Sequence, residues 1–199
     1  MANNVTFSQL LGGYEIVGTP ITNGRLPQKL TSAMGIINED LKETRYEPIF
    51  HIGNQVVKGM NYFFIAEKIR ATKTIEKSLV GLIINIPPGP GSIRGEGANI
   101  VQVIEKADLP SLIQNLFDVL MKDIQNISYK PIVYLGTQVV KGVNHSFICE
   151  ARAHVTGAQP YPVILTINVI EGNGSIVGIL PLTTLAKVPK NLLGYAFTW

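Results

Sequence analysis

Three histidines and one cysteine are the side chains of this 199-residue chain best suited to metal binding or nucleophilic catalysis. His51, His145 and His154 fall on predicted strands, with no Glu, Asp or Cys at the spacing of metal ligands. Cys149 lies on a strand that points it inward, where a thiol is a small buried hydrophobe. We therefore expect packing or surface histidines, no metal, no cofactor and no enzymatic activity.

The chain contains two copies of one pattern. Gln55–Asn61 (QVVKGMN) recurs as Gln138–Asn144 (QVVKGVN), an offset of 83 residues. The offset holds without a gap from residue 46 to residue 93, where 21 of 48 aligned positions are identical. Such an internal repeat predicts two similar modules, which we place at residues 1–94 and 95–199.

The repeat also helps to judge the candidate catalytic side chains. Cys149 aligns with Ala66, so a thiol is not needed in both copies. Glu67 and Glu150 do align with each other, and each is followed closely by Lys or Arg. On a strand, this arrangement favours a cross-strand ion pair over a general acid.

Composition narrows the classes of protein to consider. The chain is 46% apolar and only 16% charged, against about 25% charged in average domains, which predicts large buried contacts between modules or subunits. A net charge of +3 without a basic patch predicts no nucleic-acid partner. A single cysteine excludes a disulfide framework within one chain. No signal peptide and no run of 18 apolar residues is visible, so we expect no membrane partner and a cytoplasmic location.

Each module is predicted to be an α+β unit, with one helix packed on an antiparallel sheet of about four strands. Apolar residues at helical spacing after a Leu-Pro pair predict helices over residues 26–41 and 109–127. Strand-like runs complete each module. In the first they cover 14–17, 46–54, 60–70, 78–86 and a strand from Ser92, and in the second 100–103, 129–137, 143–155, 163–170 and a strand from Ser175.

The repeated Gln-Val-Val-Lys-Gly segment lies between two predicted strands and so predicts a hairpin connection. Gly59 and Gly142 stand where such a turn needs a positive φ. The second module also carries an apolar C-terminal tail, Leu185–Trp199. Two roles remain open for it: packing on the protein's own surface, or docking into a neighbouring subunit.

The order of glycine, strand, helix, strand and Gln-Val-Val-x-Gly resembles the cystatins, inhibitors of papain-like cysteine proteases. Gln55–Phe63 is similar to the family's first hairpin loop, and Gly12-Gly13 precedes Gln55 by a spacing similar to that of its N-terminal glycine. The resemblance covers roughly residues 12–93 and 95–176. The absence of disulfides is similar to the intracellular branch. The chain departs from the family at the second hairpin, which often carries Pro-Trp but has no Trp here, and at Asn144-His145-Ser146.

The resemblance implies an apolar wedge that fills a protease cleft, with a cysteine protease as the partner. The protease-binding residues it implies are Gly12 and Gly13, the first tip (Gln55, Val56, Val57, Lys58, Gly59), the second tip (Gln138, Val139, Val140, Lys141, Gly142) and the second turn (Pro87, Pro88, Gly89). The alternative is a non-inhibitory structural or interaction protein that keeps the cystatin-like fold. Such a protein self-assembles into a homo-oligomer through free strand edges, as a virion component does.

Overall fold

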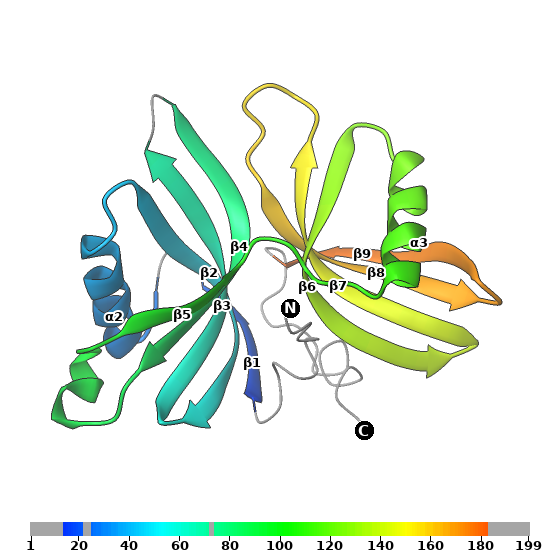
Figure 1. The fold of residues 1–199 in the computed structure, drawn as a ribbon. Helices are drawn as coiled ribbons and strands as arrows, with labels where there is room; N and C mark the ends of the chain where they lie inside the picture. The colour runs from blue at the N-terminus through cyan, green and yellow to red at the C-terminus, as the bar shows by residue number, and fades with distance from the viewer. Residues whose placement is uncertain (1–13, 22–24, 72–73, 183–199) are drawn as a thin grey trace. The chain divides into compact units, whose positions relative to one another are not determined.

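The computed structural model describes residues 14–21, 25–71 and 74–182 of the chain. These residues form two compact units, of which the first ends at Glu105 and the second begins at Lys106 (Figure 1). Gly12, Gly13 and the tail Leu185–Trp199 lie outside the described residues.

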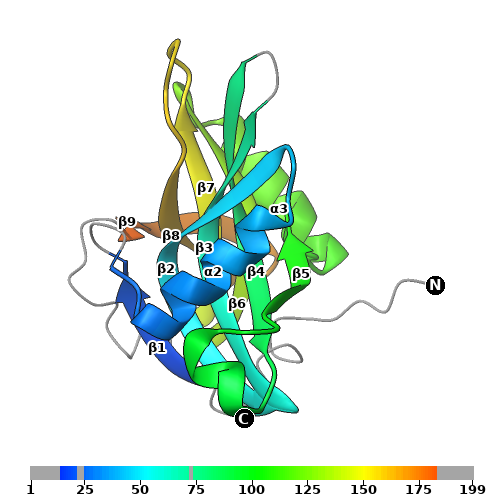
Figure 2. The same cartoon turned by 90° about the vertical axis from the view of Figure 1, so that its left-hand side faces the viewer.

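The first unit is a five-stranded antiparallel sheet whose strands follow one another in chain order. A short helix, α2 (Gln28–Glu39), crosses one face of it (Figure 2). A 3-10 turn, η2 (Pro90–Arg94), leads into the last strand. The strands are β1 (Tyr14–Pro20), β2 (Thr44–Val57), β3 (Gly59–Ala71), β4 (Ile75–Ile86) and β5 (Asn99–Ile104).

The second unit is a four-stranded antiparallel sheet, again in chain order, with one short helix, α3 (Ser111–Lys122). Its strands are β6 (Ile127–Val140), β7 (Gly142–Ala153), β8 (Tyr161–Ile170) and β9 (Asn173–Pro181). The bounds of α3 and β6 are those of α2 and β2 shifted by 83 residues, so the repeat is visible in the backbone as well.

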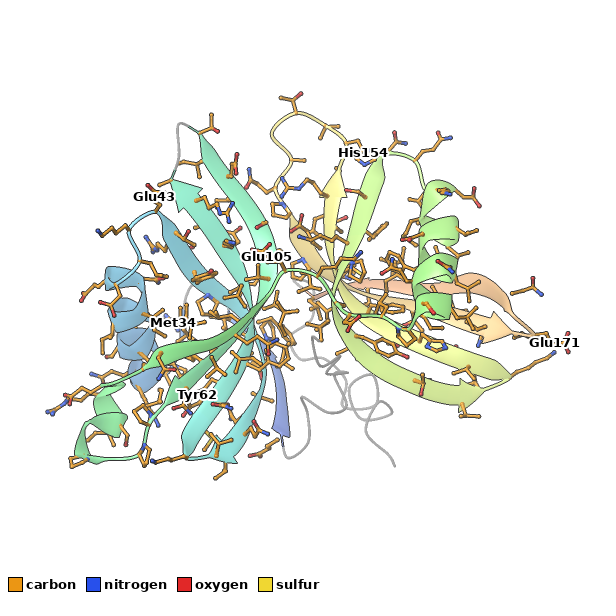
Figure 3. The ribbon with its side chains drawn as sticks, in the orientation of Figure 1. Met34, Glu43, Tyr62, Glu105, His154 and Glu171 are labelled. Atoms are coloured by element: carbon orange, nitrogen blue, oxygen red, sulfur yellow. The ribbon has the colours of Figure 1, made fainter. Side chains whose placement is uncertain are left out.

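Apolar side chains of the helices join those of the sheets in two separate cores. In the first unit, Met34 of α2 (labelled in Figure 3) belongs to one cluster with Phe64 and Ile84. In the second, the rings of Phe117 on α3 and Phe147 on β7 meet edge to face, with centroids 5.5 Å apart. Aromatic pairs prefer this geometry, which adds to the stabilisation from their burial.

The predicted fold class, two α+β modules each with one helix on about four strands, is wrong. The described residues are mostly antiparallel strand: nine strands lie in two sheets, and only two α-helices of 12 residues each accompany them. The strands β2 and β6 are longer than predicted, because pairing continues to the hairpin ends, and each reaches 14 residues. The sheets are also unequal, with five strands and four.

The extra strand of the first sheet comes from the segment between β4 and α3. A strand was predicted from Ser92, but residues 90–94 form η2 instead. Pro87, Pro88 and Pro90 remove backbone donors there, and Gly89 supplies a positive φ of 143°. The next segment, β5, pairs with β4, although the repeat aligns residues 97–103 with β1.

Side-chain contacts explain why β5 joins the first sheet. Ile100 and Val103 pack against the core that contains α2. Glu105, directly after β5 and labelled in Figure 3, pairs with the buried Lys68 of β3. The second copy has Ala151 in place of Lys68, so the equivalent ion pair cannot form there.

No helix in the described part of the chain is long and apolar enough to cross a membrane.

Candidate functional site

The tip of the β2–β3 hairpin exposes two valines. Val57 faces Gly59 in the register, with Lys58 between them. Gly59 has a φ of 103°, which confirms the predicted positive φ. Val56 is 78% exposed and Val57 is 42% exposed. Two apolar side chains therefore face solvent at a narrow tip.

The β6–β7 hairpin repeats this tip. Val139 is 81% exposed, Val140 is 43% exposed, and Gly142 has a φ of 90°. The two copies therefore share exposure and backbone conformation as well as sequence. Gln138 and Lys141 complete the second tip.

Two other elements lie beside the first tip. Tyr14, which directly follows Gly12-Gly13 in the chain, is opposite Gln55 in the β1–β2 register. A Cβ on Gly59 would lie 2.8 Å from the Cα of Pro87, so the second turn touches the tip. Pro88 and Gly89 are exposed beyond it. The start of β1, the tip and the second turn thus share one end of the first sheet.

The second tip has one such neighbour among the described residues. A Cβ on Gly142 would lie 2.5 Å from the carbonyl oxygen of Val169, at the end of β8. Glu171, in the turn that follows, is labelled at that end of the sheet in Figure 3. No described strand takes the place that β1 has in the first unit.

A row of three amide side chains lies behind the first tip, at facing positions on β2, β3 and β4. Asn61 Nδ2 donates to Gln55 Oε1 at 3.1 Å, and Asn85 Nδ2 donates to Asn61 Oδ1 at 2.8 Å. Because each amide both donates and accepts, the row links the hairpin to the neighbouring strand.

The second unit has the same row, with one extra bond. Asn144 Nδ2 donates to Gln138 Oε1 at 3.3 Å, and the buried Asn168 donates to Asn144 Oδ1 at 2.8 Å. Asn168 Nδ2 also donates to the carbonyl oxygen of Lys141 at 3.3 Å, which holds the tip directly. Asn85 and Asn168 were not predicted as site residues, although their identity in the two copies was a usable signal.

The extra bond predicts different costs for one substitution in the two copies. Asn168→Ala is expected to lower the free energy of unfolding by about 2 kcal/mol, because it removes two partly buried hydrogen bonds. Asn85→Ala removes the bond to Asn61 and is expected to cost about 1 kcal/mol. Urea denaturation of both variants measures the difference. Equal costs would contradict a role for Asn168 in holding Lys141.

The histidines form local contacts or are exposed. His51 Nε2 lies 2.8 Å from Asn54 Oδ1, and burial lowers the pKa of His51. His145 Nδ1 lies 2.7 Å from the Tyr134 hydroxyl, and burial lowers its pKa and raises the pKa of Tyr134 to about 12. His154 is exposed. The His51–Asn54 pair lies within β2, whereas the Tyr134–His145 pair joins β6 to β7.

Cys149 is fully buried, as predicted, and burial raises the pKa of its thiol. The predicted ion pairs of the shared glutamates are confirmed. Lys77 Nζ lies 3.0 Å from Glu67 Oε2, and Lys130 and Arg152 both approach Glu150. Across the described ranges, no three His, Cys, Asp or Glu side chains gather as a metal site.

A cavity of about 650 Å³ lies between α2 and β2. Met34 and Tyr46 line its apolar part, and Arg45 and Glu47, 2.7 Å apart, line its rim. The lining includes neither His nor Cys.

A scan against protein-family models gave no match, and a search of curated proteins gave none. A functional assignment therefore depends on the geometry of the two tips.

Proposed function

We propose that the chain is a reversible inhibitor of papain-like cysteine proteases that inserts its first hairpin tip into the protease cleft. The observation that carries the proposal is the shared location of three elements at one end of the first sheet. Exposed Val56 and Val57 stand beside the start of β1, and Gly59 of the same tip lies against Pro87 of the second turn. Such an edge is narrow and apolar, and it fits a groove.

The binding energy would come from the valines. Burying each side chain contributes about 1.5–2 kcal/mol. The amide row from Gln55 to Asn85 stiffens the tip before it binds, so little conformational entropy is lost in the complex. Gln55, whose side-chain oxygen accepts a bond from Asn61, and the backbone of the tip would supply the hydrogen bonds to the protease.

The first unit leads in this proposal, because the second lacks a described counterpart of β1 at its tip. Lys58 and Lys141 occupy the same place in both tips, so charge does not distinguish them.

Titration of papain with the full chain tests the proposal, and the two copies supply a matched control. Val57→Asp is expected to weaken inhibition at least a hundredfold, since a charged carboxylate replaces an apolar contact in the cleft. Val140→Asp, at the equivalent exposed position of the second tip, is expected to leave the first tip's inhibition intact. Absence of inhibition by the unmodified chain at tens of micromolar would overturn the proposal.

A second candidate function is assembly into a homo-oligomer, favoured by exposed apolar residues on strands at sheet edges. Val101 on β5, with Val177 and Ile179 on β9, is exposed to solvent. Edge strands with apolar side chains invite pairing with another chain. Light scattering distinguishes the two functions: a large defined oligomer that does not inhibit papain would favour assembly.

A further inference from the structure

The two copies differ at the outer edge of their first long strand. The outer edge of β2 pairs with β1 from Phe50 to Gln55. The outer edge of its copy, β6, pairs with no strand among the described residues. Ala107 donates its N–H to the Pro131 carbonyl at 2.9 Å, at the beginning of this edge. Beyond Pro131 the edge presents the same kind of backbone that β1 covers in the first unit.

The repeat shows which strand is missing. Residues 97–103 align with β1 at the offset of 83, but most of this segment is β5, on the far edge of the first sheet. A strand for the outer edge of β6 would therefore have to come from elsewhere in the chain.

We propose that residues 195–199 of the same chain supply this strand and pair antiparallel with the outer edge of β6. The sequence Leu192-Leu193-Gly194-Tyr195 repeats Leu10-Leu11-Gly12-Gly13-Tyr14, which leads into β1, with one glycine fewer. The residues after Tyr195 are Ala, Phe, Thr and Trp, which include three strand formers.

The first unit provides the register. Tyr14, Glu15 and Ile16 are opposite Gln55, Asn54 and Gly53. Shifting the β2 residues by 83 places Tyr195, Ala196 and Phe197 opposite Gln138, Thr137 and Gly136. Phe197 then lies opposite Gly136, where a large side chain would cover the gap that glycine leaves.

The segment between Leu182 and Tyr195 is long enough to reach the outer edge of β6. Leu182 follows Pro181, which is level with Val163, Cys149 and Pro131 across the sheet. From there to the far side of β6, level with Gln138, the diagonal is about 30 Å, given strand spacings near 4.8 Å and a rise near 3.3 Å per residue. The 12 residues from 183 to 194 reach roughly 43 Å when extended.

This register also bears on the second tip, a point that rests on the proposed function. Gly194 would precede the added strand as Gly13 precedes β1, so the second tip would gain the neighbour that it lacks. Pairing of the strand with β6 does not depend on protease inhibition by that tip. Disulfide cross-linking and hydrogen exchange measure the strand pairing alone.

Paired cysteines in the full chain test the register. Thr137→Cys with Ala196→Cys, and Gln138→Cys with Tyr195→Cys, are both made, because neighbouring antiparallel pairs alternate in Cα separation. Mild oxidation is expected to form an intramolecular disulfide in at least one of them, identified by mass spectrometry. Val177→Cys on β9 with Ala196→Cys is the control and is expected not to cross-link. The native Cys149 is fully buried and does not compete.

Hydrogen exchange gives a second measurement that needs no cysteine. Ala196→Pro is expected to speed exchange at β6 amides between residues 132 and 138 at least tenfold, while exchange in β2 stays unchanged. The proposal is overturned by unchanged exchange in this variant, by equal cross-linking in the β9 control, or by disulfides that join two chains. Protection of β6 that survives Ala196→Pro but is lost on deletion of residues 1–13 would assign the edge to that segment instead.

Discussion

Replacing Gly59 with alanine is expected to lower the free energy of unfolding by about 3 kcal/mol or more. Gly59 has a φ of 103°, which side chains rarely adopt, and a Cβ there would lie 2.3 Å from the backbone carbonyl oxygen of Ile86. That oxygen cannot move without disturbing the pairing of β3 with β4 at Met60 and Ile86. Strain in the backbone and overlap with a fixed atom therefore add together.

Alanine substitutions at two other glycines separate the cost of backbone strain from the cost of overlap with Ile86. Gly172 has a φ of 81° but nothing within 4 Å of an added Cβ, so Gly172→Ala is expected to cost about 1–2 kcal/mol of backbone strain alone. Gly35, within α2, also has open space, and Gly35→Ala is expected to stabilise by up to about 1 kcal/mol. Urea denaturation ranks the three variants. Equal losses for Gly59→Ala and Gly172→Ala would contradict the close approach of the tip to Ile86.

The Gly59→Ala and Gly172→Ala variants also test the role of the first tip in papain inhibition. Gly59→Ala pushes the first tip away from Pro87, so papain inhibition should weaken in the variant even below its unfolding midpoint. Gly172→Ala strains a turn in the other unit and should leave that inhibition unchanged. Inhibition that is equally strong in both variants would show that contact between the tip and the second turn is not needed for binding.

The hairpin tips were predictable because the residues that determine them are neighbours in the sequence. Two apolar runs flank Gln-Val-Val-Lys-Gly, and a glycine stands where the turn needs a positive φ, so a few consecutive residues determine the connection. The burial of Cys149 was also predictable, from strand alternation and its alignment with Ala66. The amide rows were harder to find, because they join residues that become neighbours only when the strand register is known.

The partner of β5 was beyond sequence reasoning for a related reason. The repeat aligns residues 97–103 with β1 and so indicates the start of a second module. The choice of β4 depends on Lys68 and Glu105, which are 37 residues apart in the chain, and on the packing of Ile100 and Val103. Where tertiary contacts decide between two strand partners, local pattern and repeat alignment do not.

Glu105→Gln is therefore expected to loosen β5 and to lower the free energy of unfolding of the first unit by about 2 kcal/mol. The Lys68 side chain is only 10% exposed, so its ammonium loses its charged partner while it stays largely out of water. Breaking a fully buried pair costs about 3–5 kcal/mol, but Glu105 is 62% exposed, which reduces the expected loss. Hydrogen exchange at residues 99–104 measures the loosening directly.

Lys68→Met provides the matched control, because it removes the buried charge and keeps a side chain of similar length. Replacing a buried ion pair with apolar residues is often neutral or stabilising, so Lys68→Met together with Glu105→Gln is expected to recover most of the stability lost in Glu105→Gln alone. A double variant as unstable as the single one would mean that the ion pair does not hold β5. In that case the packing of Ile100 and Val103 on the core would be the remaining reason for this segment to join the first sheet.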